Sequence, residues 1–571
     1  MVWMCATYVI DATALRKVAP YAIYALRSDD VGRGGRCEEM ELEMRIVSTE
    51  FDVVIVGSGI NGLVCAAHAA RRGMRVCVLE RNLEFGGCIR SDELTAPRFI
   101  HDTLSGFHPL FVSSPAYAPL AADLAAAGLV YCNNATPTGV LLPDGSHAVL
   151  TTSRDVNVAA FDRLCPGDGA AYRAQMQALE ECSTLTFGLL GSELWSRSTL
   201  WLLLSEARRS GPRGLLRFLG DSMQPARAWL NQNFEGEVLK ALLAPWVLHT
   251  GLSPDSTMSG FMARLIAFTL EAVGMPVVSG GSVRIVHAFR TLIERCGGVL
   301  LAQSHVERVV VARGRAVGVR LQGGRVLHAR RAVVCNVTPT QLYLSLLDPA
   351  VVPNAIQGAA KAYRYGRGSM QIHVALSEAA RWRQPALREV VMVHLTGGVD
   401  AVARAVGEAE RGLLPAQPTS VVAQPTVVDP TRAPPGASIL WIQLQELPAR
   451  VRGDAAGTIP APHDGRWTDE LKEAYARRVF STLRTQIDNF DTALVGYRVL
   501  SPTDLESLNI NLVGGDPYSG ACSIDQSFVW RPLRETVGHE THVANLYHIG
   551  AATHPGPGLG GVSGFLVASA L

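Results

Sequence analysis

The chain has 571 residues, of which 48% are hydrophobic and 18% are charged. This length allows several domains with a large buried core, and the composition excludes a disordered chain. The 52 basic and 51 acidic residues leave a net charge of +1, so no strong positive field is present and no nucleic-acid partner is expected.

Residues 1–50 differ in character from the rest of the chain, and we predict an N-terminal extension that is poorly ordered, with a transit peptide as the alternative. No stretch reaches the roughly 18 apolar residues of a membrane span, and a secretory signal is not evident. The 11 cysteines form no C-x-x-C pair, which indicates a reducing compartment and no bound metal. We therefore predict a cytoplasmic protein.

The first recognisable unit begins at Phe51. A buried strand is predicted over 52–56 and the turn Gly57-Ser58-Gly59-Ile60-Asn61-Gly62 follows it directly. A helix rich in alanine is predicted over 63–72, and a second strand over 75–79. Together these elements form a βαβ unit of the kind that binds dinucleotides.

Each conspicuous residue of this unit has a physical role in such a site. Gly57 suits the tight turn, Gly59 allows a pyrophosphate to approach the main chain, and Gly62 allows the helix to pack closely on the sheet. Glu80 ends the second strand, where a carboxylate accepts hydrogen bonds from ribose hydroxyls and repels a 2′-phosphate. The unit therefore predicts an FAD or NAD site rather than an NADP site, with Ile60 and Asn61 also in contact with the cofactor.

A glycine pair distinguishes between the two cofactors. Gly86-Gly87 follows the acidic strand end closely and would suit a second phosphate-facing loop. The run from Asp52 to Gly87 resembles the extended FAD fingerprint of the amine oxidase and carotenoid desaturase superfamily. The resemblance implies FAD rather than NAD, with Arg81, Gly86 and Gly87 among its contacts.

A second glycine-rich segment lies near the C-terminus. A short strand is predicted over 545–549, a loop over 550–561 and a helix from Val562 to Leu571. This leaves no room for a second nucleotide fold, so we expect the strand to join the sheet begun at Phe51 and the helix to direct its positive N-terminus at the flavin. The segment is similar to the flavin-contacting motif of phytoene desaturases, which implies cofactor contacts at Gly550, Ala551, Gly558, Gly560, Gly561 and Val562.

The resemblance extends over most of residues 51–571. The segments 101–110, 429–436 and 511–516 look like the phytoene dehydrogenase-related subgroup. A β-meander is predicted over 299–337, with turns at Gly314 and at Gly323-Gly324. By analogy with the family, the main chain of Val306 would meet the adenine.

The resemblance implies an α/β fold: a Rossmann-type FAD-binding domain, glutathione reductase-like and of the amine oxidase and phytoene desaturase type, with an interleaved α+β substrate domain. We assign the discontinuous segments 51–115, 276–345 and 515–571 to the FAD-binding domain. The substrate-binding domain then comprises 116–275 and 346–514.

The segment from Leu200 to Arg217 has two interpretations. Its apolar start and following arginines could form a basic amphipathic helix on a membrane, or a buried bundle helix with a solvated basic end. The interruption at Gly211-Pro212 shortens any amphipathic face and favours the buried helix. Peripheral membrane contact is therefore the less favoured prediction.

The resemblance implies an FAD-dependent dehydrogenase or desaturase that removes two hydrogens from a hydrophobic small molecule, preferably at a C–C bond. The alternatives are a flavin amine oxidase, a polyene isomerase or saturase, and a non-enzymatic prenyl or lipid escort protein. His108, His554 and His101 are expected beside the flavin as candidate catalytic bases, although packing or hydrogen bonding is an equally suitable role. Oxygen or a quinone could serve as electron acceptor; the substrate and the oligomeric state are not predicted.

Overall fold

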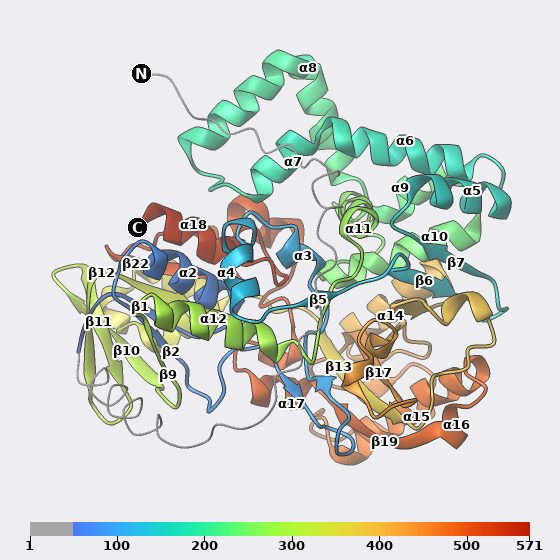
Figure 1. The fold of residues 1–571 in the computed structure, drawn as a ribbon. Helices are drawn as coiled ribbons and strands as arrows, with labels where there is room; N and C mark the ends of the chain where they lie inside the picture. The colour runs from blue at the N-terminus through green and yellow to red at the C-terminus, as the bar shows by residue number, and fades with distance from the viewer. Residues whose placement is uncertain (1–48) are drawn as a thin grey trace.

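The computed structural model describes residues 49–571. The predicted extension, residues 1–50, lies almost wholly outside the described residues. Two seven-stranded sheets form the two lobes that stand side by side in Figure 1, and a group of helices lies above the second sheet.

Five parallel strands from both ends of the chain form the centre of the first sheet. In spatial order they are β9 (Val299–Leu301), β2 (Val76–Leu79), β1 (Glu50–Val56), β12 (Val326–Asn336) and β22 (Leu546–Ile549). The antiparallel strands β10 (Val306–Ala312) and β11 (Arg315–Leu321) extend the sheet along the first part of β12, as the predicted meander requires. The prediction that the C-terminal strand joins the sheet begun at Phe51 is confirmed, with β12 between β22 and β1.

Three helices pack together on one side of this sheet: α2 (Ile60–Arg71), α12 (Val283–Arg295) and α18 (Val562–Ala570). The helix α2 begins three residues earlier than predicted. The turn needs only Gly57, Ser58 and Gly59, so Gly62 already lies within the first helical turn.

The second sheet is mainly antiparallel. Its strands, in spatial order, are β19 (Leu494–Leu500), β13 (Gly368–Leu376), β17 (Ser438–Leu447), β16 (Ser420–Ala423), β14 (Met392–Leu395), β6 (Thr138–Leu141) and β7 (His147–Leu150). Side chains such as Ile372 and Ile442 pack on Tyr475 and Phe480 of α15 (Asp469–Gln486), which covers one face. The opposite face of β13 and β17 is turned toward the cavity described below.

The helices above the second sheet are α5 (Arg154–Leu164), α6 (Asp168–Glu181), α7 (Ser183–Leu190), α8 (Arg197–Met223), α9 (Ala226–Asn233), α10 (Glu237–Leu243) and α11 (Ser259–Val273). Shorter helices elsewhere are α3 (Pro109–Val112), α4 (Ala121–Ala126), α13 (Asn354–Lys361), α14 (Val399–Glu410), α16 (Phe490–Ala493) and α17 (Pro502–Leu508). Two-stranded ribbons pair β3 (Ser91–Asp92) with β4 (His101–Asp102), β5 (Tyr131–Cys132) with β8 (Val277–Val278), β15 (Leu413–Leu414) with β18 (Gly453–Asp454), and β20 (Pro532–Leu533) with β21 (Thr536–Val537).

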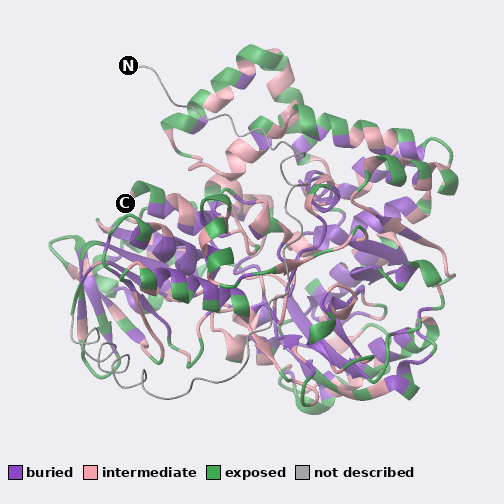
Figure 2. Ribbon diagram, in the orientation of Figure 1, coloured by how far each residue is buried: buried purple, intermediate pink, exposed green. Residues whose placement is uncertain are grey.

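The helix α8 projects from the molecule and is largely exposed or half-buried (Figure 2). Gly211 has φ 73° and breaks the helix, so the chain turns back on itself there. Leu200, Trp201 and Leu216 are 57%, 64% and 67% exposed. The favoured prediction of a buried bundle helix is therefore wrong for these side chains, because the break leaves both halves with an outward apolar side. Membrane contact stays a prediction, and no helix among residues 49–571 is long and apolar enough to cross a bilayer.

Candidate active site

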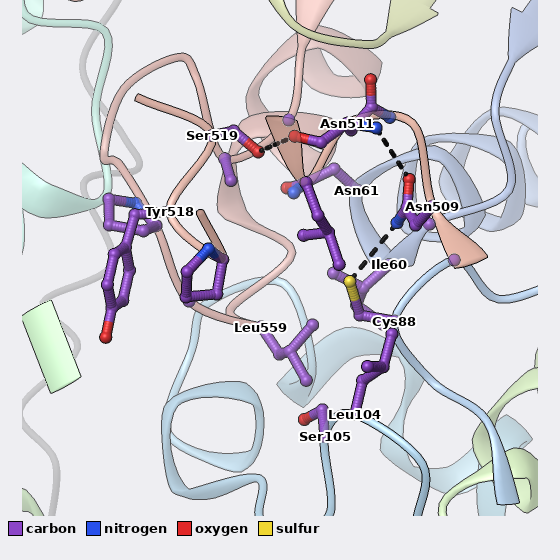
Figure 3. A pocket seen from close by; sticks show the side chains of 18 of the residues that line it. Ile60, Asn61, Cys88, Leu104, Ser105, Asn509, Asn511, Tyr518, Ser519 and Leu559 are labelled. Carbon is purple, nitrogen blue, oxygen red and sulfur yellow. Dashed lines mark hydrogen bonds between the residues drawn. The ribbon is translucent and has the colours of Figure 1, made fainter. Parts of the chain in front are cut away.

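A cavity of about 480 Å³ is lined by both sheets and by α11. Val56, Leu79 and Asn336, at the carboxyl ends of three parallel strands, open onto it. Ligands of open α/β sheets bind at this end of the strands. Figure 3 shows how residues from distant segments, among them Ile60, Cys88 and Leu559, converge on the cavity.

The first glycine turn has the geometry that a pyrophosphate requires. Gly57 has φ 94°, and a Cβ there would lie 2.9 Å from the carbonyl oxygen of Asn336. Gly59 lines the cavity and precedes α2, whose first turn contains no acidic residue and no side-chain cap. The N–H groups of this turn are therefore available to an anion. Gly62 acts by packing, since its Cβ would lie 2.2 Å from the carbonyl oxygen of Gly57.

Glu80 holds two loops together and lines the cavity. Its Oε2 accepts hydrogen bonds from the hydroxyl and the N–H of Ser58, at 2.6 and 3.2 Å, and its Oε1 accepts one from the N–H of Asn82 at 3.0 Å. The Ser58 hydroxyl accepts a further bond from the N–H of Gly86 at 2.9 Å. These donors fix a buried carboxylate in position to accept from ribose hydroxyls.

The glycine pair lies directly against the first turn. Gly86 and Gly87 have φ 112° and 61°, and a Cβ on Gly87 would lie 3.2 Å from the Cα of Gly59. Asn509 donates to the Cys88 sulfur at 3.4 Å and accepts from the N–H of Asn511 at 3.1 Å (Figure 3). Arg81 and Val306, for which cofactor contacts are expected, also line the cavity. The part played by Asn509 was not predicted.

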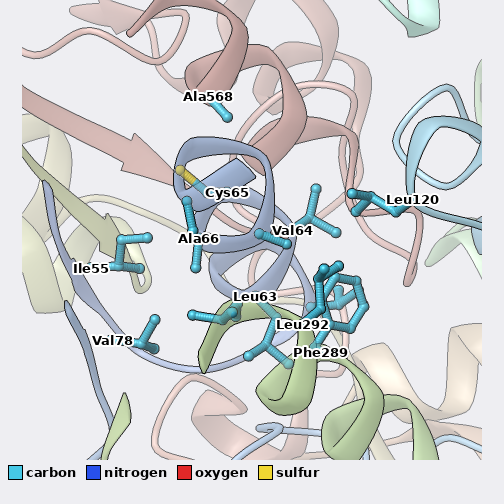
Figure 4. Close-up of a cluster of buried hydrophobic side chains, with 14 of the residues drawn as sticks. Ile55, Leu63, Val64, Cys65, Ala66, Val78, Leu120, Phe289, Leu292 and Ala568 are labelled. Carbon is cyan, nitrogen blue, oxygen red and sulfur yellow. The ribbon is translucent and has the colours of Figure 1, made fainter. Parts of the chain in front are cut away.

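Part of the C-terminal loop lines the cavity, whereas the helix that follows it packs on α2. Gly550, Ala551 and Gly558 line the cavity. Gly560, Gly561 and Val562, for which cofactor contacts are also expected, do not line it, because the helix α18 that they lead into packs on α2. Figure 4 shows Ala568 of α18 beside the α2 residues of the buried cluster.

The first turn of α18 contacts cavity residues of α2 and of the C-terminal loop, where the Ser563 hydroxyl accepts from the N–H of Gly550 at 3.1 Å. The N–H of Gly564 donates to Oδ1 of the cavity residue Asn61 at 3.3 Å. A Cβ on Gly564 would lie 1.9 Å from the Asn61 carbonyl oxygen, so the two helices are in backbone contact. The helix α18 therefore supports α2, and the direct action of its dipole on the flavin stays a prediction.

The three candidate histidines have different surroundings. His108 lines the cavity, is 1% exposed, and has no hydrogen-bond partner at either ring nitrogen among the described residues. Burial lowers its pKa to about 4, so the ring is neutral at pH 7. A buried imidazole without partners is costly unless a ligand supplies them.

The other two histidines do not line the cavity. The Nε2 of His101 is 2.8 Å from the Thr95 hydroxyl, and the ring packs edge-on against His373. The Nε2–H of His554 donates to the carbonyl oxygen of Leu189 at 2.9 Å, which ties the C-terminal loop to α7. These positions do not support a catalytic role for His101 or His554; both stabilise the segments around the cavity.

Arg531 is a buried residue of the cavity wall that was not predicted from the sequence. Arg531 lines the cavity, is 2% exposed and donates to the Ala551 carbonyl oxygen at 2.8 and 3.1 Å. It also donates to the Tyr518 carbonyl oxygen at 2.9 Å. A fixed positive charge therefore lies beside the loop in which the flavin-contacting motif is expected.

Two segments of the resemblance, 101–110 and 429–436, meet in one buried ion-pair network. The Arg432 guanidinium bonds Asp102 at 2.8 Å and Asp429 at 2.9 Å, and all three side chains are at most 1% exposed. Asp102 also accepts from the N–H of Ser282 at 2.7 Å. The network joins segments 101–108, 278–282 and 429–432, and it thereby positions the segment that carries His108.

The comparisons with known proteins decide the family. A family model described as flavin containing amine oxidoreductase matches residues 60–558. The chain belongs to the flavin-containing amine oxidoreductase family. The described residues fit its cofactor, since the glycine turns, Glu80 and the C-terminal loop line one cavity. This member of the family is an FAD-dependent oxidoreductase.

Two curated relatives and one solved structure illustrate the similarity. The rat pyridine nucleotide-disulfide oxidoreductase domain-containing protein 2 is 26% identical, with 90% of this chain and 92% of the relative covered. The zeta-carotene-forming phytoene desaturase of Myxococcus xanthus is also 26% identical, over 89% of this chain and 90% of the relative. The structure of an oxidoreductase from Methanosarcina mazei has a TM-score of 0.57 at 16% identity, covering 91% of this chain and 99% of that one, and it shows the shared fold.

Proposed function

We propose that this oxidoreductase dehydrogenates a hydrophobic, uncharged small molecule at a C–C bond. The observation that carries the proposal is an apolar part of the cavity wall that lies outside the cofactor loops. It consists of apolar side chains, namely Met258, Met262, Leu265 and Ile266 at and within α11, with Trp246, Leu252 and Met392 beside them. Such a wall binds an apolar molecule through the hydrophobic effect and excludes water.

The reaction removes one hydride and one proton from adjacent carbons of the substrate. When bound, FAD supplies the hydride acceptor. A proton acceptor is then needed, and His108 is the histidine of the three candidates that lines the cavity with unpartnered nitrogens. Its neutral ring can accept a proton or a hydrogen bond and donate at the other nitrogen.

An amine substrate is less well supported. Among the described residues, Glu80 is the only acidic side chain that lines the cavity, and three loop donors already bond it. A substrate ammonium group would therefore lose its hydration without gaining a counter-charge beside the apolar wall. The lack of a second acidic group among the described lining residues favours an uncharged substrate.

The test is anaerobic reduction of the purified protein. Loss of the visible flavin bands near about 450 nm should occur with a member of an isoprenoid hydrocarbon and alcohol panel, and the product should contain one more double bond. Bleaching by amines alone would overturn the proposal, and an isomerised product without net bleaching would identify an isomerase instead. Readmission of oxygen or of a quinone would then identify the electron acceptor.

A further inference from the structure

One face of the second sheet presents polar groups to the cavity. Alternate residues of β13 and β17 share this face, namely Ser369 and Gln371 on β13 and Gln443 and Gln445 on β17. Gln371 lies directly opposite Gln443 in the antiparallel register. We call these four residues the amide face. The residues between them, such as Met370 and Leu444, point to the hydrophobic core under α15.

The amide face holds acceptors that the protein leaves unsatisfied. Ser369, Gln371 and Gln445 are 1%, 2% and 3% exposed, yet Ser369 Oγ, Gln371 Oε1 and Gln445 Oε1 have no hydrogen-bond partner among the described residues. Buried polar groups are normally paired, so three unpaired oxygens on one cavity wall indicate a ligand that pairs with them.

The orientation of both amides is fixed by their nitrogens. Gln371 Nε2 donates to the Leu104 carbonyl oxygen at 3.4 Å, and Gln445 Nε2 donates to the Tyr518 hydroxyl at 3.1 Å. Tyr518 in turn donates to the Leu248 carbonyl oxygen at 2.5 Å. The two Oε1 atoms therefore remain as acceptors. Leu104, which accepts from Gln371, lies four residues before His108 in the sequence.

We propose that the amide face binds a hydroxyl group of the substrate, so that the substrate is an apolar alcohol rather than a pure hydrocarbon. The inference rests on the proposed function, because it names a substrate class for the same cavity. A substrate hydroxyl would donate to one of the two Oε1 atoms and accept from the Ser369 hydroxyl, whereas a hydrocarbon would pair with none of the three oxygens. An ammonium group would require a carboxylate, and no amide-face residue is acidic.

The experiment compares three probes of the same shape: benzyl alcohol, ethylbenzene and benzylammonium. Each is titrated anaerobically into the purified holoenzyme, and binding is followed by the change in the visible flavin absorbance, which requires no turnover. The same titrations are made with the double variant Gln371→Leu/Gln445→Leu, with the milder Ser369→Ala, and with Gln417→Leu, whose residue is exposed and does not line the cavity.

Benzyl alcohol should bind the double variant about tenfold more weakly, and Ser369→Ala a few-fold more weakly, while ethylbenzene binds both variants unchanged or more tightly. Gln417→Leu should resemble the parent protein for every probe. Equal changes for benzyl alcohol and ethylbenzene, or a greater loss for benzylammonium than for benzyl alcohol, would overturn the hydroxyl assignment. If the double variant retains no flavin, the binding of benzyl alcohol and ethylbenzene to Ser369→Ala tests the hydroxyl assignment instead. If no compound of the isoprenoid panel bleaches the flavin, the dehydrogenase function is refuted. The binding result with the three probes is unaffected by that outcome.

Discussion

At the scale of single residues, Glu80 combines cofactor recognition with loop assembly. Three protein donors hold its carboxylate, and they belong to the two segments that carry the glycine turns. These hydrogen bonds explain why a buried acidic side chain is tolerated in the cavity wall. A charged carboxylate with three N–H or O–H donors is stabilised in the absence of a basic partner.

We expect Glu80→Ala to weaken FAD binding about tenfold to a hundredfold, because the ribose loses its acceptor and Ser58 loses its anchor. The ratio of visible to ultraviolet absorbance after dialysis, followed by FAD titration, measures this effect. Glu84→Ala provides the control, since Glu84 is exposed and does not line the cavity. Full flavin retention in Glu80→Ala would contradict the assigned role.

We expect His108→Phe to retain flavin but to slow anaerobic flavin reduction at least about tenfold, because the ring shape persists and the proton acceptor is lost. Stopped-flow absorbance with an active panel compound gives the rate. His463→Phe, on an exposed loop, should reduce at the parental rate. Since burial holds the His108 pKa near 4, the parental rate should show no histidine titration between pH 6 and 8.

Sequence reasoning found the residues that share a contiguous motif and missed those that do not. Gly57, Gly59 and Glu80 stand within one βαβ unit, so their spacing alone predicts a common site. Arg531, Asn509 and Gln371 reach the same cavity from separate segments without a local pattern. Their roles depend on tertiary contacts that a single sequence does not reveal.

At the scale of elements, the contact between α2 and α18 determines the shape of the first glycine turn. Gly564 allows the two backbones to touch at Asn61. The same pair of helices contributes to the buried cluster that surrounds Leu63 and Ala66 (Figure 4). Displacement of α18 should therefore shift α2 and change the conformation of the first glycine turn.

Gly564→Ala should lower both the thermal unfolding midpoint and the flavin content, since its Cβ would lie 1.9 Å from the Asn61 carbonyl oxygen. Gly407→Ala is the matched control, because Gly407 also lies within a helix and has no atom within 4 Å of the added Cβ. That control should be neutral or more stable by about 1 kcal/mol. Equal behaviour of the two variants would show that the helix contact tolerates a methyl group.

Arg432→Met should cost about 3–5 kcal/mol of stability, because Asp102 and Asp429 would be left buried without their cation. The shift of the urea unfolding midpoint measures the loss. Arg466→Met removes an exposed pair, with side chains 77% and 58% exposed, and should change stability by at most about 1 kcal/mol. A similar midpoint for both variants would argue against the network as a stabilising joint.

Element prediction succeeded where the local pattern matched the final environment. The β-branched run of β1 and the meander from β9 to β12 have their predicted positions. The helix α8 was misjudged, since an apolar run such as Leu200–Leu204 has the same composition in a core or on a surface. Only the fold places its break at Gly211 and its apolar side outward.

At the scale of the whole molecule, buried neutral histidines link stability to pH. Burial lowers the pKa values of His108, His373, His548 and His554 to about 4. The ordinary value in an unfolded chain is about 6.5. Between about pH 4 and pH 6.5 these histidines are protonated in the unfolded chain but neutral in the folded protein. The free energy of unfolding therefore falls as the pH is lowered through this range.

We expect each of these histidines to cost about 1.4 kcal/mol of stability at pH 5.5 relative to pH 8, with full stability above about pH 7. The thermal unfolding midpoint, measured with saturating FAD at each pH, should fall steeply below pH 6.5. A midpoint that stays constant down to pH 5 would show that these rings are charged or solvated in the folded protein.

The parallel position of β22 beside β12 has a consequence for synthesis of the protein. Residues 333–336 pair with β1 on one side and with β22 on the other. While residues 546–549 remain inside the ribosome, that second edge of β12 has no partner, and an open strand edge invites association with other chains. Residues 333–336 therefore gain their second strand partner only after β22 has been synthesised, which makes completion of this sheet a late step of folding.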